Sequence, residues 1–579
     1  VAYRAADVLG VLDGLVSGPT TVHRRRRRAP IVAAAAVLLA AVAVGAYALR
    51  SKRAPAAVVA PSAGRMIAVL PFTAIGGSRD DDYFSDGLTD ELAHALAHVP
   101  GLSLAGRDAS YTFKGKHVTA QEVGRVLGVN AYVSATVRRS GDRLRVTPQL
   151  VSTADGVVLW DGVYESRSGD VFAVQDSLTR AVVAALAPAL GVHGAGDARA
   201  DHAAPLVTVG VGRGTKDADA YELYLKGMYY WHERGAGNVR RSIDYFQQAI
   251  ARDPAFARAY AALAFGYEVL RVYVPDPADS ITPLLEANAV RAVTLDTTLA
   301  DAQLAMAIAL GHDFRFREAE RHFQAALQLE PSNEFAHHAF GFMLLDIGRT
   351  DDAVAQLSVA TKLDPLAKSA GTALAEALIA ARRFPEAKAE TRRILAIDST
   401  FSLALASLGL DQTLGGQPDS GVRTLELGAR LYPELPLIQG RLMLAYAAAG
   451  RWGDVTRMQA QLRRPGADDS GALLPAFADL VLGDREPLVR LLTTRSSQRR
   501  WFDMFGGTGC NPLVDPLWAD ERFRGAMGNL GIRPCPLARP WPVPTQGKNG
   551  AEIQQAQTDR RRQIPNGAKF QEAPNSKRR

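Results

Sequence analysis

Apolar and small residues in the second half of the chain recur with a period of 34 residues. The positions that keep this step are alanines, prolines and turn glycines. They include Ala319, Ala353 and Ala387; Ala292, Ala326 and Ala360; Pro331 and Pro365; and Gly416 and Gly450. A fixed period of this length predicts stacked helix–turn–helix units rather than one enclosed core. Such stacks usually bind other molecules along their length, so the pattern favours a binding protein.

Each unit carries an apolar face at helical spacing. Ala319, Phe323 and Ala326 stand at i, i+4 and i+7, which places them on one side of a helix. Small alanines let the two helices of a hairpin approach closely, and the aromatic ring fills the space between units. Pro331 then ends the helix, because proline lacks an N–H group and clashes with the preceding turn.

The period is broken once, between Pro254 and Thr297. These two turn positions are 43 rather than 34 residues apart. We expect the additional residues to form a longer turn at residues 272–282.

This pattern resembles the tetratricopeptide-repeat family, which places Gly, Ala, Phe, Ala and Pro at these offsets. Gly227, Gly341 and Gly409 match the glycine in the first helix of a unit. The resemblance covers residues 217–467. It implies an all-α superhelix in which the first helix of every unit lines a concave groove.

The resemblance assigns candidate groove residues to two neighbouring units. Phe335, His338 and Phe342 fall on the concave face of one first helix, and Thr372 and Glu376 fall on that of the next. A mixture of aromatic and polar side chains suits an extended peptide. We therefore expect a protein or peptide ligand in this groove, with packing between units as the alternative role of Phe342.

Residues 66–192 alternate between strand and helix patterns. A continuous apolar run opens the segment, as in a buried strand, and a Ser-Gly-Asp turn joins two later strands as a hairpin. The predicted strands are residues 66–72, 131–137, 144–150 and 157–160, and the predicted helices are residues 83–96, 121–127 and 170–190. These elements predict an α/β or α+β domain that is large enough to have its own core.

Five segments of this domain resemble the TolB-amino-terminal-like domain. They are IAVLPF, DYFSDGLTDELAHAL, VRRSGDRLRVTPQLV, DGVVLW and DVFAVQD. Bacteria place that domain beside tetratricopeptide repeats in membrane-anchored kinases, adenylate cyclases and transcriptional regulators. The resemblance implies an accessory or sensing module and supplies no catalytic residues.

Residues 29–50 are a predicted transmembrane helix, because residues 31–49 carry no charge and are long enough to span a bilayer. Five arginines precede this segment and three basic residues follow it, which favours a cytoplasmic N-terminus. We therefore expect a single-pass protein of the inner (cytoplasmic) membrane with its bulk outside the cytoplasm. The alternatives are a signal peptide that ends near Ala46-Tyr47-Ala48 and a buried soluble helix.

The formal net charge is +7, but the basic excess lies in residues 1–53 and 545–579. The middle of the chain is mildly acidic and has no basic stripe, so we expect no nucleic-acid partner. Two cysteines in 579 residues exclude a disulfide scaffold and a zinc cluster. Both lie in one region of an expected oxidising compartment, so we predict a disulfide between Cys510 and Cys535, with two unrelated thiols as the alternative.

The sequence contains no recognisable catalytic motif. Kinase motifs are absent, residues 210–216 lack the ending of a phosphate-binding loop, and three consecutive acidic residues, 80–82, are explained by a helix start. His337 and His338 point about 100° apart on a helix, so they do not chelate a metal readily. We predict no catalytic residue, no cofactor and no metal, and we predict that the chain is not an enzyme.

The predicted fold class is multidomain, with one transmembrane helix, a small α/β (or α+β) TolB-like domain and an all-α repeat superhelix with a helical cap. The expected segments are 1–28 (cytoplasmic, possible end of a kinase domain), 29–50 (transmembrane), 51–65 (linker), 66–192 (α/β domain), 193–216 (flexible linker), 217–467 (repeats), 468–544 (cap) and 545–579 (disordered basic tail). The expected function is a membrane-anchored, non-catalytic binding scaffold or sensor. The alternatives are the sensor portion of a transmembrane serine/threonine kinase and an enzyme with an unrecognised site in residues 66–192.

Overall fold

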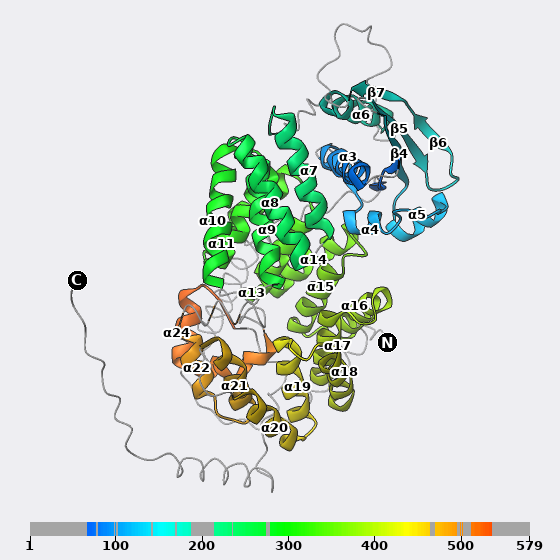
Figure 1. Ribbon diagram of the computed structural model, residues 1–579. Coiled ribbons are helices and arrows are strands. Elements are labelled where there is room, and N and C mark those ends of the chain that lie inside the picture. Colours follow the sequence, from blue (N-terminus) through cyan, green and yellow to red (C-terminus); the bar gives the residue numbers. More distant parts are fainter. Residues whose placement is uncertain are drawn as a thin grey trace, which may run out of the picture. The chain divides into compact units, whose positions relative to one another are not determined.

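The computed structural model describes residues 66–534 of the chain, with gaps (Figure 1). The gaps are residues 77–78, 98, 100–101, 141–142, 168–170, 187–213, 234, 274–277, 464–468, 495–497, 499–500 and 502–510. The described part comprises an α/β domain and a longer helical region.

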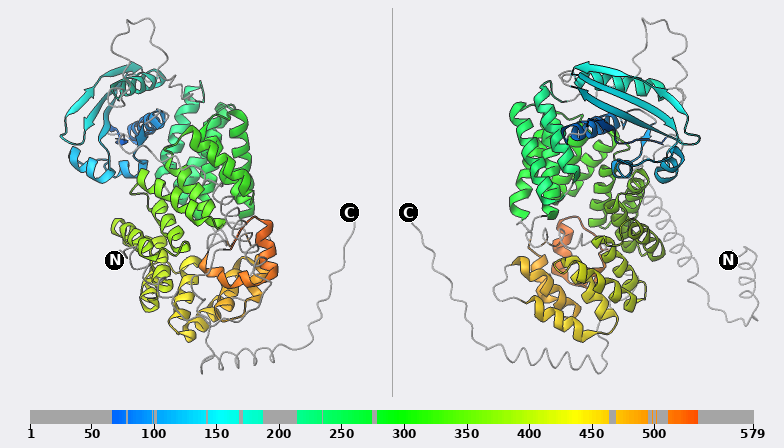
Figure 2. Two further views of the ribbon diagram at one scale, coloured as in Figure 1. Left: turned by 180° about the vertical axis from the view of Figure 1, so that it is seen from behind. Right: turned by 45° about the vertical axis from the view of Figure 1, so that its right-hand side comes forward.

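The α/β domain is built on one mixed sheet with the strand order β3-β1-β4-β5-β6. β1 is parallel to β3 and β4, and β4 and β5 form a long antiparallel hairpin in which Val133 pairs with Leu150. The strands are β1 (Met66–Val69), β2 (Thr73–Ile75), β3 (Ser103–Leu104), β4 (Ala131–Ser140), β5 (Arg143–Ser152), β6 (Val158–Asp161) and β7 (Tyr164–Arg167). The hairpin that the sequence predicts is therefore the centre of the sheet. Figure 2 shows the molecule from two further directions.

Helices cover both faces of this sheet. α3 (Arg79–Ala97) and α6 (Val171–Leu186) pack on one face, where Leu88 and Val182 join the buried core with alternate residues of β4 and β5. α4 (Arg107–Tyr111) and α5 (Ala120–Leu127) cover the other face beside β1. The domain therefore has two apolar layers, one on each side of the sheet.

The helical region consists of paired antiparallel helices from α7 to α20, and their repeated pairing identifies tetratricopeptide-like units. The bounds are α7 (Ala218–Glu233), α8 (Ala236–Arg252), α9 (Ala257–Tyr273), α10 (Ala278–Leu295), α11 (Ala300–His312), α12 (Phe316–Leu329), α13 (Glu334–Asp346), α14 (Thr350–Leu363), α15 (Lys368–Ala380), α16 (Phe384–Ile397), α17 (Ser402–Leu414), α18 (Pro418–Leu431), α19 (Pro436–Ala448) and α20 (Trp452–Leu462). Each odd-numbered helix is the first of its unit and packs against the even-numbered helix that follows. Consecutive pairs from α11 onwards begin 34 residues apart, as the sequence predicts.

The periodic residues form the core between these helices. Ala319, Phe323 and Ala326 of α12 are at most 2% exposed. Gly341 of α13 approaches α14 so closely that a Cβ atom there would stand 2.6 Å from Cγ of Leu357. Small residues at these positions therefore set the spacing of the two helices in a unit.

The broken period lies at α9 and α10, but the structure does not place all the extra residues in a turn. α9 and α10 have 17 and 18 residues, whereas α11 and α12 have 13 and 14. The prediction of a longer turn is corrected: α9 and α10 are each four residues, about one helical turn, longer than α11 and α12.

Beyond α20 the described chain forms α21 (Asp469–Val481), α22 (Glu486–Leu492), the 3₁₀ helix η2 (Pro512–Ala519) and α24 (Glu521–Asn529). Trp501 and Phe523 are fully buried in the same core as the repeats. Asp515 of η2 forms an ion pair of 2.8 Å with Arg382, in the turn after α15. These segments cover apolar surface that the last repeat helices would otherwise expose.

The α/β domain contacts the first two repeat units through α3. The hydroxyl of Tyr83 donates a hydrogen bond of 2.7 Å to Glu222 of α7. Glu91 accepts two N–H groups of Arg258 in α9, at 2.9 and 2.6 Å, and both side chains are nearly inaccessible to water. Charge-assisted bidentate pairs of this kind fix orientation as well as distance.

A second contact joins α4 to the turn after α14. The Gly106 N–H donates to the carbonyl of Leu363 at 2.5 Å, and the Ala109 N–H donates to Asp364 Oδ2 at 3.1 Å. The α/β domain therefore touches the first, second and fourth repeat units.

One part of the predicted fold class, the transmembrane helix, is corrected by the structure. None of the helices in the described residues is both long and apolar enough to cross a bilayer. The predicted span itself, residues 29–50, lies outside the described residues. The predicted membrane localisation was based on that segment and stays a prediction.

Candidate functional site

The first helices of the units form a continuous row in which each contacts the next, from α7 to α19. This row corresponds to the face where the sequence predicts a groove. Its helices differ in how much of their surface is accessible.

α13 brings together three of the predicted groove residues. The ring of Phe335 meets Trp231 of α7 and Phe265 of α9 edge-on, with ring centroids 6.3 and 5.6 Å apart. His338 lies beside Phe335, with centroids 6.3 Å apart, and Phe342 is 40% exposed. Phe335 therefore contributes to the contact between units, whereas Phe342 presents an aromatic ring to the surface.

α15 holds the other two predicted residues, and both have partners within the chain. Thr372 is buried, and its hydroxyl donates to the carbonyl of Lys368 at 2.8 Å. Glu376 accepts two N–H groups from Arg441 of α19, at 2.7 and 2.9 Å, and also contacts the hydroxyl of Ser407. The structure thus gives both residues an internal role, which leaves α13 as the accessible part of the predicted groove.

Two other sequence-based candidates are placed as follows. His337 is buried between Gln356 and the carbonyl of Pro331, at 2.6 and 3.0 Å. Cys510 and Cys535 lie outside the described residues, so their predicted disulfide stays a prediction. Across the described ranges, no group of three acidic, histidine or cysteine side chains could hold a metal ion.

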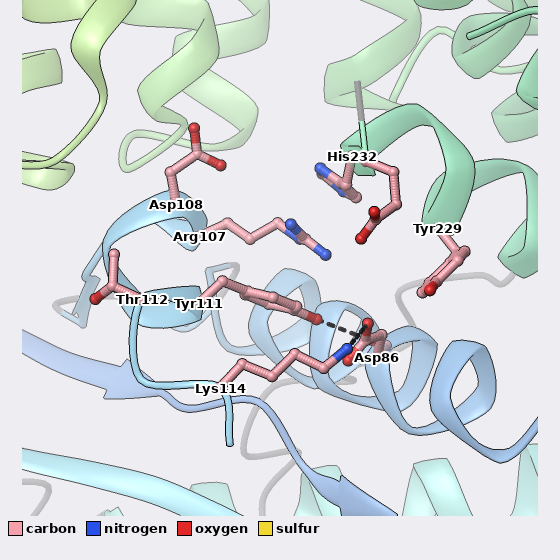
Figure 3. A pocket seen from close by; sticks show the side chains of 9 residues that line it. Asp86, Arg107, Asp108, Tyr111, Thr112, Lys114, Tyr229 and His232 are labelled. Atoms are coloured by element: carbon pink, nitrogen blue, oxygen red, sulfur yellow. Dashed lines mark hydrogen bonds and ion pairs between the residues drawn. The ribbon is translucent and has the colours of Figure 1, made fainter. Parts of the chain in front are cut away.

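A polar cavity of about 360 Å³ lies where α3 and α4 meet α7 (Figure 3). Figure 3 shows that Asp86 reaches it from α3, that Arg107 and Tyr111 reach it from α4, and that Tyr229 and His232 reach it from α7. The cavity is also lined by Asp108, Thr112, Lys114 and Glu233. Titratable side chains from three elements therefore converge in one hollow, which makes it a candidate binding site.

An ion pair and its neighbouring contacts hold several of the lining side chains in position. Arg107 Nε donates to Asp90 Oδ1 at 2.8 Å, and the guanidinium carbon lies 3.5 Å from the centroid of the Tyr111 ring. The Tyr111 hydroxyl lies 3.2 Å from the same carboxylate oxygen, and Nε2 of His232 lies 3.6 Å from the other one. Asp90 therefore holds the cationic and aromatic groups of the cavity in place.

Burial shifts the titration of these groups. It raises the pKa of Asp86 to about 6, although Lys114, whose Nζ lies 2.5 Å from Oδ2, opposes the shift. Burial also raises the pKa of Asp90 against the opposing charge of Arg107, and it raises the pKa of Tyr111. Burial disfavours the Arg107 cation, but the carboxylate of Asp90 outweighs this and raises the pKa of Arg107. Such shifts are typical of functional sites, and ion-pair networks that only support the fold show them too.

Sequence reasoning missed this cavity. The acidic run it considered, residues 80–82, lies in the first turns of α3. The signal that could have found the site is the i, i+4 spacing of Asp86 and Asp90, which places both carboxylates on one side of that helix. The contribution of α7 could not be predicted, because Tyr229 is 143 positions beyond Asp86.

Comparisons with known proteins give one curated relative and several solved structures. No protein-family model matches this chain. A curated protein of Rhizobium meliloti (strain 1021), named "Putative adenylate cyclase 3", is 30% identical to it over 256 residues. The match covers 44% of this chain and 41% of the relative, so the chain spans less than half of that protein. This finding corrects the prediction that the chain is not an enzyme, because the relative bears the name of one.

The similar solved structures are helical-repeat proteins. YrrB, described as a TPR protein with an unusual peptide-binding site, is 18% identical, with a TM-score of 0.26 over 33% of this chain and 95% of YrrB. PilF of Pseudomonas aeruginosa is 18% identical, with a TM-score of 0.31 over 38% of this chain and 95% of PilF. The human IFIT1 dimer with PPP-AAAA is 15% identical, with a TM-score of 0.34 over 47% of this chain and 70% of IFIT1. These TM-scores are too low to support an argument, so the repeat fold is established by the chain's own helix pairs.

Proposed function

We propose that this chain is a binding scaffold whose repeats hold a peptide segment of a partner protein at α13. The observation that carries the proposal is the exposed aromatic ring of Phe342 on a first helix, in the same row of helices as Phe335 and His338. Covering an exposed apolar side chain contributes about 25 cal/mol for every Å² removed from water. A peptide that places an apolar side chain on Phe342 gains this energy.

The neighbouring helix limits how far such a peptide extends. Along α15 the side chains are buried, apart from Lys368, Ser369 and Glu376, and Glu376 is held by Arg441. The peptide therefore gains few contacts on α15, so we expect recognition to concentrate on α13. A short anchored segment fits this surface better than a long extended chain.

Peptide selection followed by a matched pair of substitutions tests this proposal. Peptides selected from a random library on the full chain are measured by fluorescence anisotropy against the variants Phe342→Ala and Leu427→Ala. Both side chains are 40% exposed, but Leu427 lies on α18, the second helix of its unit. We expect Phe342→Ala to weaken binding about tenfold or more and Leu427→Ala to leave it unchanged. Equal effects of the two substitutions, or none, would reject α13 as the site.

Adenylate cyclase activity is a second candidate function, and the curated relative is the observation that favours it. The matched part is less than half of that protein, so the activity of the whole relative is a proposal for this chain. The test is to incubate the purified chain with ATP and Mg²⁺ and to measure cyclic AMP. Formation of cyclic AMP at a rate proportional to protein concentration supports the activity. Its absence under conditions in which a known cyclase is active rejects the activity for this chain and leaves the scaffold proposal standing.

We also propose that the α/β domain is an accessory module of the TolB-like type, in a signalling protein. Its sequence resemblance supports this assignment, and its ion pair with α9 and its contact with the turn after α14 connect it to the repeats. The kinase-sensor alternative stays a prediction.

A further inference from the structure

The two carboxylate oxygens of Asp86 differ in their surroundings. Oδ2 accepts a hydrogen bond from Lys114 Nζ at 2.5 Å. Oδ1 is buried and has no hydrogen-bond donor among the described residues, although the side chain as a whole is only 3% exposed. A buried charged oxygen without a donor is costly, because water no longer solvates it. Asp86 also lines the cavity, so a ligand that displaces Lys114 can reach this carboxylate.

Lys114 shows which chemical group this position holds. Its ammonium nitrogen is bound to Asp86 and lies 6.0 Å from the ring centroid of Tyr111 and 5.9 Å from that of Tyr229. Aromatic rings attract cations at such distances. The side chain of Lys114 is 39% exposed and comes from the segment after α4, so it can leave this position without exposing core.

The charges around the cavity favour a cation over an anion. The lining carries three carboxylates, from Asp86, Asp108 and Glu233, two cationic side chains, Arg107 and Lys114, and the imidazole of His232. Arg107 is already paired with a fourth carboxylate, Asp90, which lies behind the lining residues. An added anion would meet this excess of negative charge, whereas an added cation would reduce it.

We propose that this cavity binds a compact organic ammonium ion, either a free amine or a lysine side chain, which contacts Asp86 between the rings of Tyr111 and Tyr229. The ligand displaces Lys114 and donates to the carboxylate of Asp86. A cavity of about 360 Å³ accommodates an amine of a few carbon atoms. This site is separate from the peptide surface on α13 and does not depend on it.

Titration calorimetry on the full chain tests the proposal with two probes. Putrescine represents a free amine, Nα-acetyl-lysine amide represents a lysine side chain, and succinate serves as the anionic comparison. We expect one or both ammonium probes to bind more tightly than succinate. Tighter binding of putrescine indicates a free amine as the source of the ligand, and tighter binding of the lysine derivative indicates a protein side chain.

Three variants distinguish the proposed site from binding elsewhere. Asp86→Asn should weaken binding about tenfold or more, because it removes a charge-assisted hydrogen bond. Lys114→Met should strengthen binding, because it removes the competing ammonium group. Glu165→Gln is the matched control, because this carboxylate is 66% exposed on β7 and does not line the cavity.

The proposal is overturned if neither wild type nor Lys114→Met binds an ammonium probe at about 1 mM. It is also overturned if succinate binds more tightly, or if Asp86→Asn and Glu165→Gln have equal effects. Circular dichroism checks that Asp86→Asn is folded. Should that variant unfold, Tyr229→Leu replaces it: weaker binding of the probe supports the site, and unchanged binding rejects it.

Discussion

Single buried carboxylates determine how parts of this molecule respond to pH, and Asp364 shows this at the contact between α4 and the repeats. It is 2% exposed and accepts the backbone N–H groups of Ala109, Leu366 and Ala367. Burial, together with the neighbouring carboxylate of Asp108, raises the pKa of Asp364 from 3.8 to about 6. Below about pH 6 the neutral form of Asp364 is therefore the favoured form in the folded chain.

The raised pKa predicts a definite sign of pH dependence. Between about pH 4 and 6 the folded state keeps the Asp364 proton and the unfolded state releases it, so the stability contributed by this group falls as pH rises through this window. Across this window the free energy of unfolding contributed by Asp364 changes by about 3 kcal/mol at most. Asp364→Asn keeps a carbonyl oxygen for the Ala109 N–H but cannot ionise. We expect thermal melts from pH 4 to 7 to show that the melting temperature of Asp364→Asn rises relative to that of wild type as the pH rises.

A second substitution checks the cause of this shift. Asp108→Asn removes the neighbouring negative charge and should move the inflection of the wild-type stability curve to lower pH. An Asp364→Asn variant whose stability follows the wild-type curve over the whole range would show that another carboxylate causes the pH dependence.

Residues also show where sequence reasoning reached its limit. Ala319, Phe323 and Ala326 could be assigned to the core in advance, because their spacing within one helix reveals their common face. Glu376 could not be assigned, because its partner Arg441 belongs to a helix 65 positions further along the chain. A residue on the predicted concave face thus became part of an internal ion pair. The residues of the polar cavity were missed for the same reason, since they come from three separated helices.

At the level of elements, the tight packing inside each unit depends on glycines in first helices. Gly409 of α17 faces α18, and a Cβ atom there would lie 2.3 Å from Cγ of Leu425, which is fully buried. We expect Gly409→Ala to destabilise the fold by about 1–3 kcal/mol, because the buried leucine has no room to move. Urea unfolding followed by circular dichroism measures this change.

The matched control is a helical glycine without close neighbours. Gly525 lies in the middle of α24, and nothing stands within 4 Å of a Cβ atom placed there. Gly525→Ala should stabilise the protein by about 0.5–1 kcal/mol through the lower entropy of the unfolded chain. Similar effects of the two substitutions on the free energy of unfolding would mean that close packing does not restrict the size of the residue at position 409.

Long elements were predictable and short ones were not. The hairpin of β4 and β5 extends over ten residues in each strand, enough for alternation to be visible. β3 has two residues and β2 has three, which is too short for any period. The additional turns of α9 and α10 were misassigned because a proline lies inside α10, at Pro283, where the sequence indicates a break.

On the scale of the whole molecule, the buried pair of Glu91 and Arg258 joins the α/β domain to the repeats. Both side chains are at most 6% exposed. Arg258→Met removes the guanidinium that neutralises the buried carboxylate of Glu91, which should cost about 3–5 kcal/mol. We expect faster hydrogen exchange in α3 and α9 and a lower melting temperature.

An exposed pair in the same domain is the control for this prediction. Arg145 and Glu165 lie 3.5 Å apart and are more than half exposed, so Arg145→Met should change stability by less than about 1 kcal/mol. The double variant Glu91→Leu with Arg258→Met should recover much of the lost stability, because it leaves no unpaired charge. Unchanged exchange in α3 of Arg258→Met would show that the α/β domain is held mainly by its other contacts.

The attachment of the α/β domain to the first, second and fourth units has a mechanical consequence. A stack of repeats is easily deformed, because each unit touches only its neighbours and small changes at every junction add up along the axis. A folded domain that is fixed both to α9 and to the turn after α14 bridges several units and restrains their relative movement. Stretching or twisting should therefore be resisted between α9 and α14, so that the segment around α13 keeps a fixed curvature.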